Sequence, residues 1–165
     1  MFQKPENDLF YLVHDVAHLM RTKFDQKARE WGMTRAQCII LIKLHYKPGM
    51  TQNEMAALCE IEPITVARLV DRLEANGLVK RCPDPSDRRV KRLHLMPEAE
   101  PVLERIKEIR ELSQQELIGD MDPALRQGAV EALKHMKNKL SPAGTTRCQG
   151  MLASVPSAEP KEKDV

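Results

Sequence analysis

The residues of this sequence best suited to chemistry are basic, and many of them lie in one stretch. Residues 78–95 hold six basic side chains and two acids, a balance of +4, whereas the whole chain carries only +2. Such a cluster can neutralise phosphates, so it predicts a polyanionic partner. The six side chains are Lys80, Arg81, Arg88, Arg89, Lys91 and Arg92.

Two helices are predicted just before this stretch. Thr51 followed by Glu54 is a capping box, which predicts a short helix from about Gln52 to Cys59. Glu62 and Pro63 then open a second helix, because proline at the first helical position loses no hydrogen bond. Its apolar residues share one face: Val66, Leu69, Val70 and Leu73. The other face, which can enter a groove of DNA, holds Ile64, Thr65, Arg68, Asp71 and Arg72.

A β-hairpin follows the second helix. Asn76 and Gly77 are typical of a helix C-terminus, and residues 78–81 and 90–95 have strand-like composition. The residues between them, 82–89, are rich in Pro and Asp and form the predicted tip. Together these elements predict a winged helix-turn-helix whose wing is basic; the alternative is a solvated hairpin without a partner.

The remaining chain predicts long amphipathic helices. They cover residues 8–31, 97–121 and 123–140, with Asp122 as a cap, and Thr34 caps a buried helix that contains Cys38 and Leu44. The predicted fold is therefore mainly α with a small β-hairpin wing. Residues 1–34 and 97–140 are predicted to form a helical dimerisation region, and residues 35–96 the DNA-binding domain. Residues 141–165 are predicted to be a disordered tail.

The long helices offer more apolar surface than one copy can bury, so we expect a homodimer; a monomeric bundle is the alternative. A two-fold dimer predicts an inverted-repeat operator in duplex DNA. No apolar run reaches the ~20 residues of a membrane span, and no signal peptide is recognisable, which predicts a cytoplasmic protein. No phosphate loop or nucleophile elbow is present, so we expect neither catalysis nor a cofactor.

Residues 51–95, and more loosely 8–139, resemble the MarR family of bacterial transcriptional regulators. The specific motifs are 70–74 (VDRLE), 77–79 (GLV) and the wing tip 87–89 (DRR). Residues 61–63, the wing tip and 99–101 are most similar to the SlyA branch. One departure is Met96-Pro97, where the family usually has a Thr cap, so we expect a weaker cap there.

The resemblance implies a role for each candidate residue. Thr65 and Arg68 would enter the major groove, Arg89 would reach the minor groove, and Asp87 would hold the wing arginines. In addition, we expect Gln52, Arg72 and Lys91 to contact phosphates of the DNA backbone. The complete predicted DNA-binding set is Gln52, Pro63, Thr65, Arg68, Arg72, Asp87, Arg88, Arg89 and Lys91.

The resemblance also implies a pocket for a small aromatic or carboxylate effector that releases a repressor from DNA. When this sequence is matched to the family by position, the wall of that pocket would include His14, Cys38, Ile42 and Arg68. Alternatives remain open: a winged helix used for protein contacts, a metal response through His14 and His18, or a thiol response through Cys82. The family's peroxide-sensing cysteine in the first helix has no counterpart, because no cysteine precedes Cys38.

Overall fold

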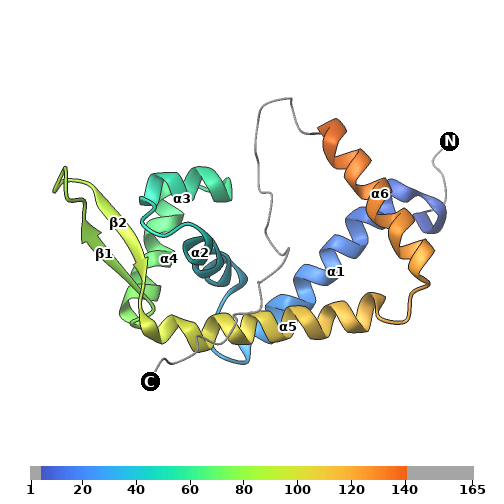
Figure 1. Ribbon diagram of the computed structural model, residues 1–165, viewed down its shortest axis with the longest axis horizontal. Helices are drawn as coiled ribbons and strands as arrows, with labels where there is room; N and C mark the ends of the chain where they lie inside the picture. The colour runs from blue at the N-terminus through green and yellow to red at the C-terminus, as the bar shows by residue number, and fades with distance from the viewer. Residues whose placement is uncertain (1–4, 141–165) are drawn as a thin grey trace, which may run out of the picture. The chain divides into compact units, whose positions relative to one another are not determined.

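The computed structural model describes residues 5–140 (Figure 1). The contacts between residues divide the chain into two compact units, one ending at Ile109 and one beginning at Arg110. The predicted tail, 141–165, and Cys148 lie outside the described residues. The helices are α1 (Leu9–Arg29), α2 (Arg35–Tyr46), α3 (Gln52–Cys59), α4 (Pro63–Ala75), α5 (Glu100–Ile118) and α6 (Pro123–Leu140), with 3-10 turns at Pro5–Asn7 and Pro97–Ala99. The strands β1 (Val79–Pro83) and β2 (Lys91–Leu95) form an antiparallel hairpin.

Side-chain caps fix where the first helices begin. The Asp8 carboxylate accepts hydrogen bonds from the first amides of α1, at 2.8 and 3.2 Å. Thr34 and Gln37 form a capping box at α2, and Thr51 and Glu54 form the predicted one at α3. These bonds satisfy amides that have no partner within the helix, so the sequence determines each starting point locally.

The helix-turn-helix and the start of the wing depend on two residues with positive φ. Glu60, at φ 55°, turns the chain between α3 and α4. Gly77, at φ 71°, follows the end of α4, and the amide of Leu78 bonds to the carbonyl of Leu73 at 2.9 Å. This chain reversal leads directly into β1, as the Asn76-Gly77 pair predicted.

The core of the first unit lies among α2, α3, α4 and the hairpin. Ile40, Leu41 and Leu44 of α2 have no exposed surface. Ile39 and Ile42 of the same helix are only half-buried, so α2 is less completely enclosed than its apolar composition indicated. The other fully buried large side chains are Met55, Leu73, Leu93, Val66, Val70, Val79 and Cys38. This core holds α4 and the wing in one body.

The long helix after the wing begins later than predicted. A 3-10 turn covers Pro97–Ala99, and α5 starts at Glu100. Met96 occupies the cap position without a side-chain hydrogen bond, as its lack of a hydroxyl predicted. The helix ends at Ile118.

In the second unit, α6 starts where predicted. The Asp122 carboxylate accepts hydrogen bonds from the amides of Ala124 and Leu125, at 2.9 and 3.0 Å. No residue of α6 is buried within the described chain, although its sequence is amphipathic. Leu125 and Leu133 are among the large apolar side chains left exposed.

None of the described helices is both long enough and apolar enough to cross a membrane.

Candidate nucleic-acid interface

The exposed face of α4 carries the predicted DNA-contacting residues. Pro63 is the first residue of the helix, and Thr65, Arg68 and Arg72 are all exposed. The opposite face packs into the core, as its spacing predicted. Since buried and polar faces are separated, α4 can present its polar face to a partner while it stays attached to the core.

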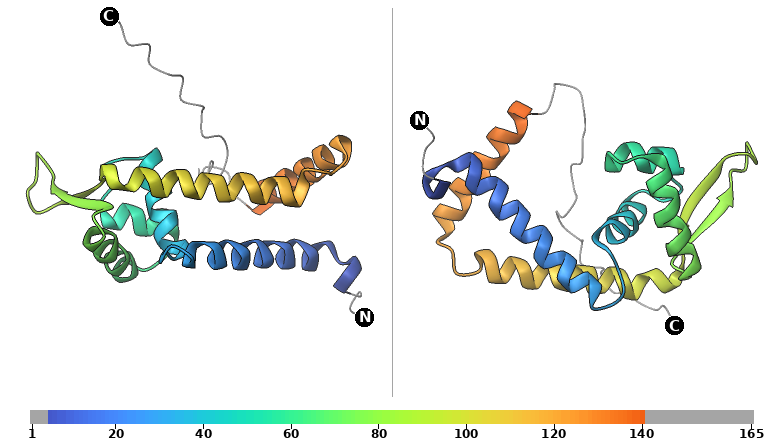
Figure 2. Two further views of the ribbon diagram at one scale, coloured as in Figure 1. Left: turned by 90° about the horizontal axis from the view of Figure 1, so that it is seen from below. Right: turned by 180° about the vertical axis from the view of Figure 1, so that it is seen from behind.

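The wing extends outward beside α4 (Figures 1 and 2). Its register pairs Val79 with Leu95 at the base and Pro83 with Lys91 near the tip. The base is attached to the α2–α3 turn, because Gly49 donates to the carbonyl of Leu93 at 3.0 Å and Leu93 donates to that of Met50 at 2.8 Å. These backbone bonds make the hairpin continuous with the helix-turn-helix.

Arg81 of β1 is bound inside the protein. Its guanidinium forms ion pairs with Glu74 and with Asp71, the latter at 2.6 Å. Its Nε donates to Oε1 of Gln52 at 2.7 Å, and Nη2 donates to the Ala67 carbonyl at 3.3 Å. The Arg81 amide also donates to Glu74 and holds the pKa of that carboxyl below its ordinary value. Arg81 therefore joins α3, α4 and β1, and two carboxylates already surround its charge.

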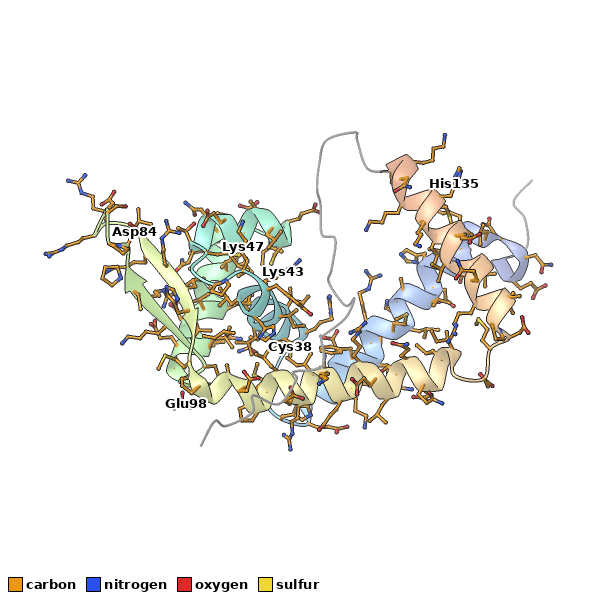
Figure 3. The ribbon with its side chains drawn as sticks, viewed as in Figure 1. Cys38, Lys43, Lys47, Asp84, Glu98 and His135 are labelled. Carbon is orange, nitrogen blue, oxygen red and sulfur yellow. The ribbon has the colours of Figure 1, made fainter. Side chains whose placement is uncertain are left out.

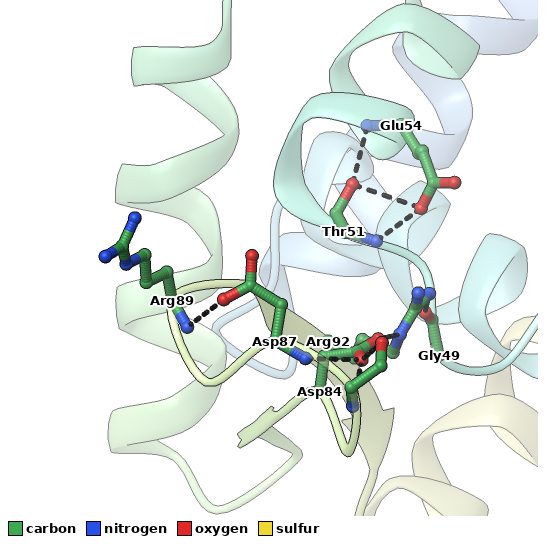
Figure 4. A network of polar contacts seen from close by, with 8 residues as sticks. Gly49, Thr51, Glu54, Asp84, Asp87, Arg89 and Arg92 are labelled. Atoms are coloured by element: carbon green, nitrogen blue, oxygen red, sulfur yellow. Dashed lines mark hydrogen bonds and ion pairs between the residues drawn. The ribbon is translucent and has the colours of Figure 1, made fainter.

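Arg92 of β2 is also engaged. Its Nε forms an ion pair with the buried carboxylate of Asp84, and Nη1 donates to the Gly49 carbonyl at 2.8 Å (Figure 4). Two of the six wing cations thus hold the protein together. Within residues 5–140, no ion pair engages the other four, which are Lys80, Arg88, Arg89 and Lys91. The charge available to a partner is therefore concentrated at the tip and outer edge of the wing.

Asp84 organises the wing tip (Figures 3 and 4). Its Oδ1 accepts hydrogen bonds from the Ser86 amide at 2.8 Å, the Ser86 hydroxyl at 2.5 Å and the Asp87 amide at 3.2 Å. Together with the Arg92 guanidinium, these donors hold the pKa of the Asp84 carboxyl well below its usual range. An Asx turn of this kind shapes the loop that carries Arg88 and Arg89.

Asp87 has a more local contact than Asp84. Its Oδ1 accepts from the backbone amide of Arg89 at 3.0 Å. Of the two wing-tip carboxylates, Asp84 is the one that forms an ion pair with a wing arginine, Arg92, and the sequence did not predict this pair. The Asp-Pro-Ser order at residues 84–86 is a turn signal that could have drawn attention to it.

The other predicted DNA-contacting residues occupy the edges of this face. Gln52 is the first residue of α3 and is half-buried, and its amide oxygen is bonded to Arg81. Lys91 is exposed at the first position of β2. The predicted set thus comes from α3, α4 and the hairpin, all of which lie in the first unit.

The four residues predicted to line an effector pocket are spread over three helices. His14 is exposed on α1, Cys38 is buried on α2, Ile42 is half-buried on α2, and Arg68 is exposed on α4. In the described part of the chain, no hydrogen bond or ion pair joins their side chains. Burial raises the pKa of the Cys38 thiol to about 12, so Cys38 behaves as an apolar core residue and not as a reactive thiol.

A helix-turn-helix that is continuous with a basic hairpin defines a winged-helix DNA-binding protein. The model of the MarR family matches residues 33–91. The uncharacterized HTH-type transcriptional regulator YsmB of Bacillus subtilis is 31% identical over 99 residues, which cover 60% of this chain and 68% of YsmB. The chain belongs to the MarR family of transcriptional regulators.

Solved structures have the same fold. MepR, a transcription regulator of the Staphylococcus aureus multidrug efflux pump MepA, is similar at 26% identity and a TM-score of 0.70, over 81% of this chain and 99% of MepR. A complex of MepR with DNA is similar at 26% identity and a TM-score of 0.68, over 84% of this chain and 100% of that protein.

Proposed function

We propose that this regulator is a homodimer that binds inverted-repeat duplex DNA in the cytoplasm and represses transcription by occluding a promoter. The observation that carries the proposal is the division of the wing's charge. Carboxylates of the protein hold Arg81 and Arg92, whereas no ion pair within residues 5–140 engages the cations at the tip and outer edge, beside the exposed face of α4. The structure of the similar protein MepR in complex with DNA supports DNA as the partner.

The residues divide into three kinds of contact. Thr65 and Arg68 read bases in the major groove, with Pro63 at the start of the same helix. Gln52, Arg72 and Lys91 contact phosphates and fix the position of the module on the duplex. Arg89 enters the minor groove beside Arg88, and Asp87 orders the backbone that carries them.

The dimer rests on apolar side chains that one copy leaves exposed. Phe10, Val16 and Leu19 of α1 are more than half exposed, at 83%, 51% and 58%. Leu133 in α6 is also 50% exposed. Such surface is stable in water when a second copy covers it, and a two-fold dimer places its two α4 helices about one DNA turn, ~34 Å, apart.

Sedimentation of the free protein tests this dimer. We expect the wild type to sediment as two chains and Leu133→Glu to shift toward one chain, because a carboxylate would be buried in the apolar contact. The matched control is Lys134→Glu, which changes the charge of the next, exposed residue. A monomeric wild type, or equal effects of the two variants, would contradict the proposed contact.

We further propose that a small aromatic or carboxylate ligand weakens DNA binding from a pocket near His14, Cys38, Ile42 and Arg68. Within the family we place the chain in the SlyA branch, on residues 61–63, 87–89 and 99–101. A calorimetric screen of aromatic carboxylates tests the pocket. Heat of binding together with weaker operator affinity is the expected result, and the absence of both across the screen would contradict it.

A further inference from the structure

The bonds of Arg81 fix the orientation of a neighbouring side chain. The Arg81 side chain is only 20% exposed, and its guanidinium reaches Gln52, Ala67, Asp71 and Glu74. An arginine side chain has donors and no acceptor. The Gln52 group that faces Arg81 at 2.7 Å must therefore be the amide oxygen, and the amide NH2 must face away.

Gln52 also has a defined place in the module. It is the first residue of α3, next to the Thr51 cap, whose bonds to Glu54 measure 2.7 to 3.2 Å. Both ends of its side chain are thus constrained, one by the helix start and the other by Arg81. A side chain that is already ordered loses less conformational entropy when it binds.

We propose that Arg81 is a positioning residue for DNA binding, which holds the oxygen of the Gln52 amide so that its NH2 donates to a DNA phosphate. This inference rests on the proposed function, in which Gln52 contacts the phosphate backbone. Arg81 itself contacts no phosphate, because its nitrogens are used inside the protein. It also keeps the carboxylates of Asp71 and Glu74 paired beside the interface, where free negative charge would repel DNA.

Gln52→Glu separates the two functions of this side chain. Glutamate keeps an acceptor for Arg81 and suits the first turn of a helix, so the free energy of unfolding should not fall. It removes the NH2 donor, so affinity for the duplex upstream of the protein's own gene should fall by about tenfold or more. The matched control is Asn53→Asp, which places the same charge on the next, exposed residue of α3. Equal losses for the two variants would overturn the inference.

A double-mutant cycle tests the role of Arg81. Arg81→Lys keeps the positive charge beside Asp71 and Glu74 but loses the Nε donor that orients Gln52. We expect it to weaken DNA binding by about fivefold or more when Gln52 is present and to have little effect in the Gln52→Ala background. A purely structural role would make the two effects on affinity additive, and that result would overturn the inference.

The wild type and Arg89→Ala separate this inference from the proposed function. If the wild type binds no duplex better than a scrambled one, and Arg89→Ala binds equally weakly, the proposed function fails and this inference fails with it. If the wild type binds specifically and Arg89→Ala weakens it, while Gln52→Glu binds as the wild type does, only this inference is overturned.

Discussion

Asp84 and Arg92 form an ion pair across the end of the wing, and Arg92 continues the connection to the Gly49 carbonyl. The Asp84 side chain is 7% exposed, whereas the Arg92 side chain is 40% exposed. The loop that carries Arg88 and Arg89 is thereby bonded to the turn between α2 and α3. The free protein consequently holds its wing tip in a defined shape before any DNA is present.

Asp84→Asn should weaken DNA binding while the fold is retained. Asparagine keeps the size of the side chain but loses the charge that pairs with Arg92, so the wing tip becomes less ordered. We expect affinity for operator DNA to fall by about fivefold or more, measured by anisotropy. Asp120→Asn, at an exposed residue of the second unit, is the control and should bind as the wild type does.

The Asp84→Asn variant also gives a prediction for how the stability of the fold depends on pH. Because donors hold the pKa of Asp84 below its unfolded value of about 4, its charged form stabilises the folded state at neutral pH. This stabilisation is complete above the unfolded pKa and is lost as the pH falls from about 4 toward the folded pKa. The stability difference between wild type and Asp84→Asn should therefore be constant from pH 7 to about 5 and shrink below about 4. A difference that grows in acid would contradict this assignment.

Arg89→Ala tests the wing as a DNA contact. The Arg89 side chain is exposed and makes no ion pair among the described residues, so its removal should leave the fold and the dimer intact. We expect operator affinity to fall by about tenfold or more and the slope of log K against log salt to decrease by about 1. Lys134→Ala, on α6, serves as the control. An unchanged affinity and slope would remove the wing from the interface.

Thr51→Ala should destabilise the module through α3. The hydroxyl of Thr51 accepts from the Glu54 amide at 3.2 Å, and the Glu54 carboxylate accepts from the Thr51 amide at 2.7 Å. Loss of the hydroxyl half of this capping box should lower the free energy of unfolding by about 1 kcal/mol in urea denaturation. Thr51→Ser retains the hydroxyl and should restore most of that loss. If Thr51→Ala were as stable as the wild type, the cap would have no net effect on the free energy of unfolding.

Cys38 should resist alkylation in the folded protein. Burial raises the pKa of its thiol to about 12, so very little of the reactive thiolate forms at pH 8. Cys59 and Cys82 are half-buried, and we expect iodoacetamide to modify them well before Cys38, as followed by peptide mass spectrometry. Unfolding in urea should make all three equally reactive. Rapid labelling of Cys38 in the native protein would contradict its buried state and favour a thiol-responsive regulator.

Local signals in the sequence predicted much of this fold. The capping box at Thr51, the cap at Asp122 and the glycine at Gly77 each depend on a few neighbouring residues, and each lies where predicted. The separation of buried and exposed residues on α4 follows from helical periodicity alone. Such features need no knowledge of distant contacts.

The partners of the wing arginines could not be predicted in this way. Arg81 meets Gln52, which is 29 residues away in the sequence, and Arg92 meets Gly49, which is 43 residues away. Sequence composition treated all six wing cations alike, whereas tertiary structure engages two of them internally. The choice of Asp87 over Asp84 has the same origin, because only the folded hairpin brings Asp84 to Arg92.

The most direct test is fluorescence anisotropy with the duplex upstream of the protein's own gene and a scrambled duplex, across a salt series. The account predicts tight binding to the upstream duplex, two chains per site, and a steep decrease of affinity with salt. Equally weak binding to both duplexes, with one chain per site, would contradict a dimeric operator-binding regulator.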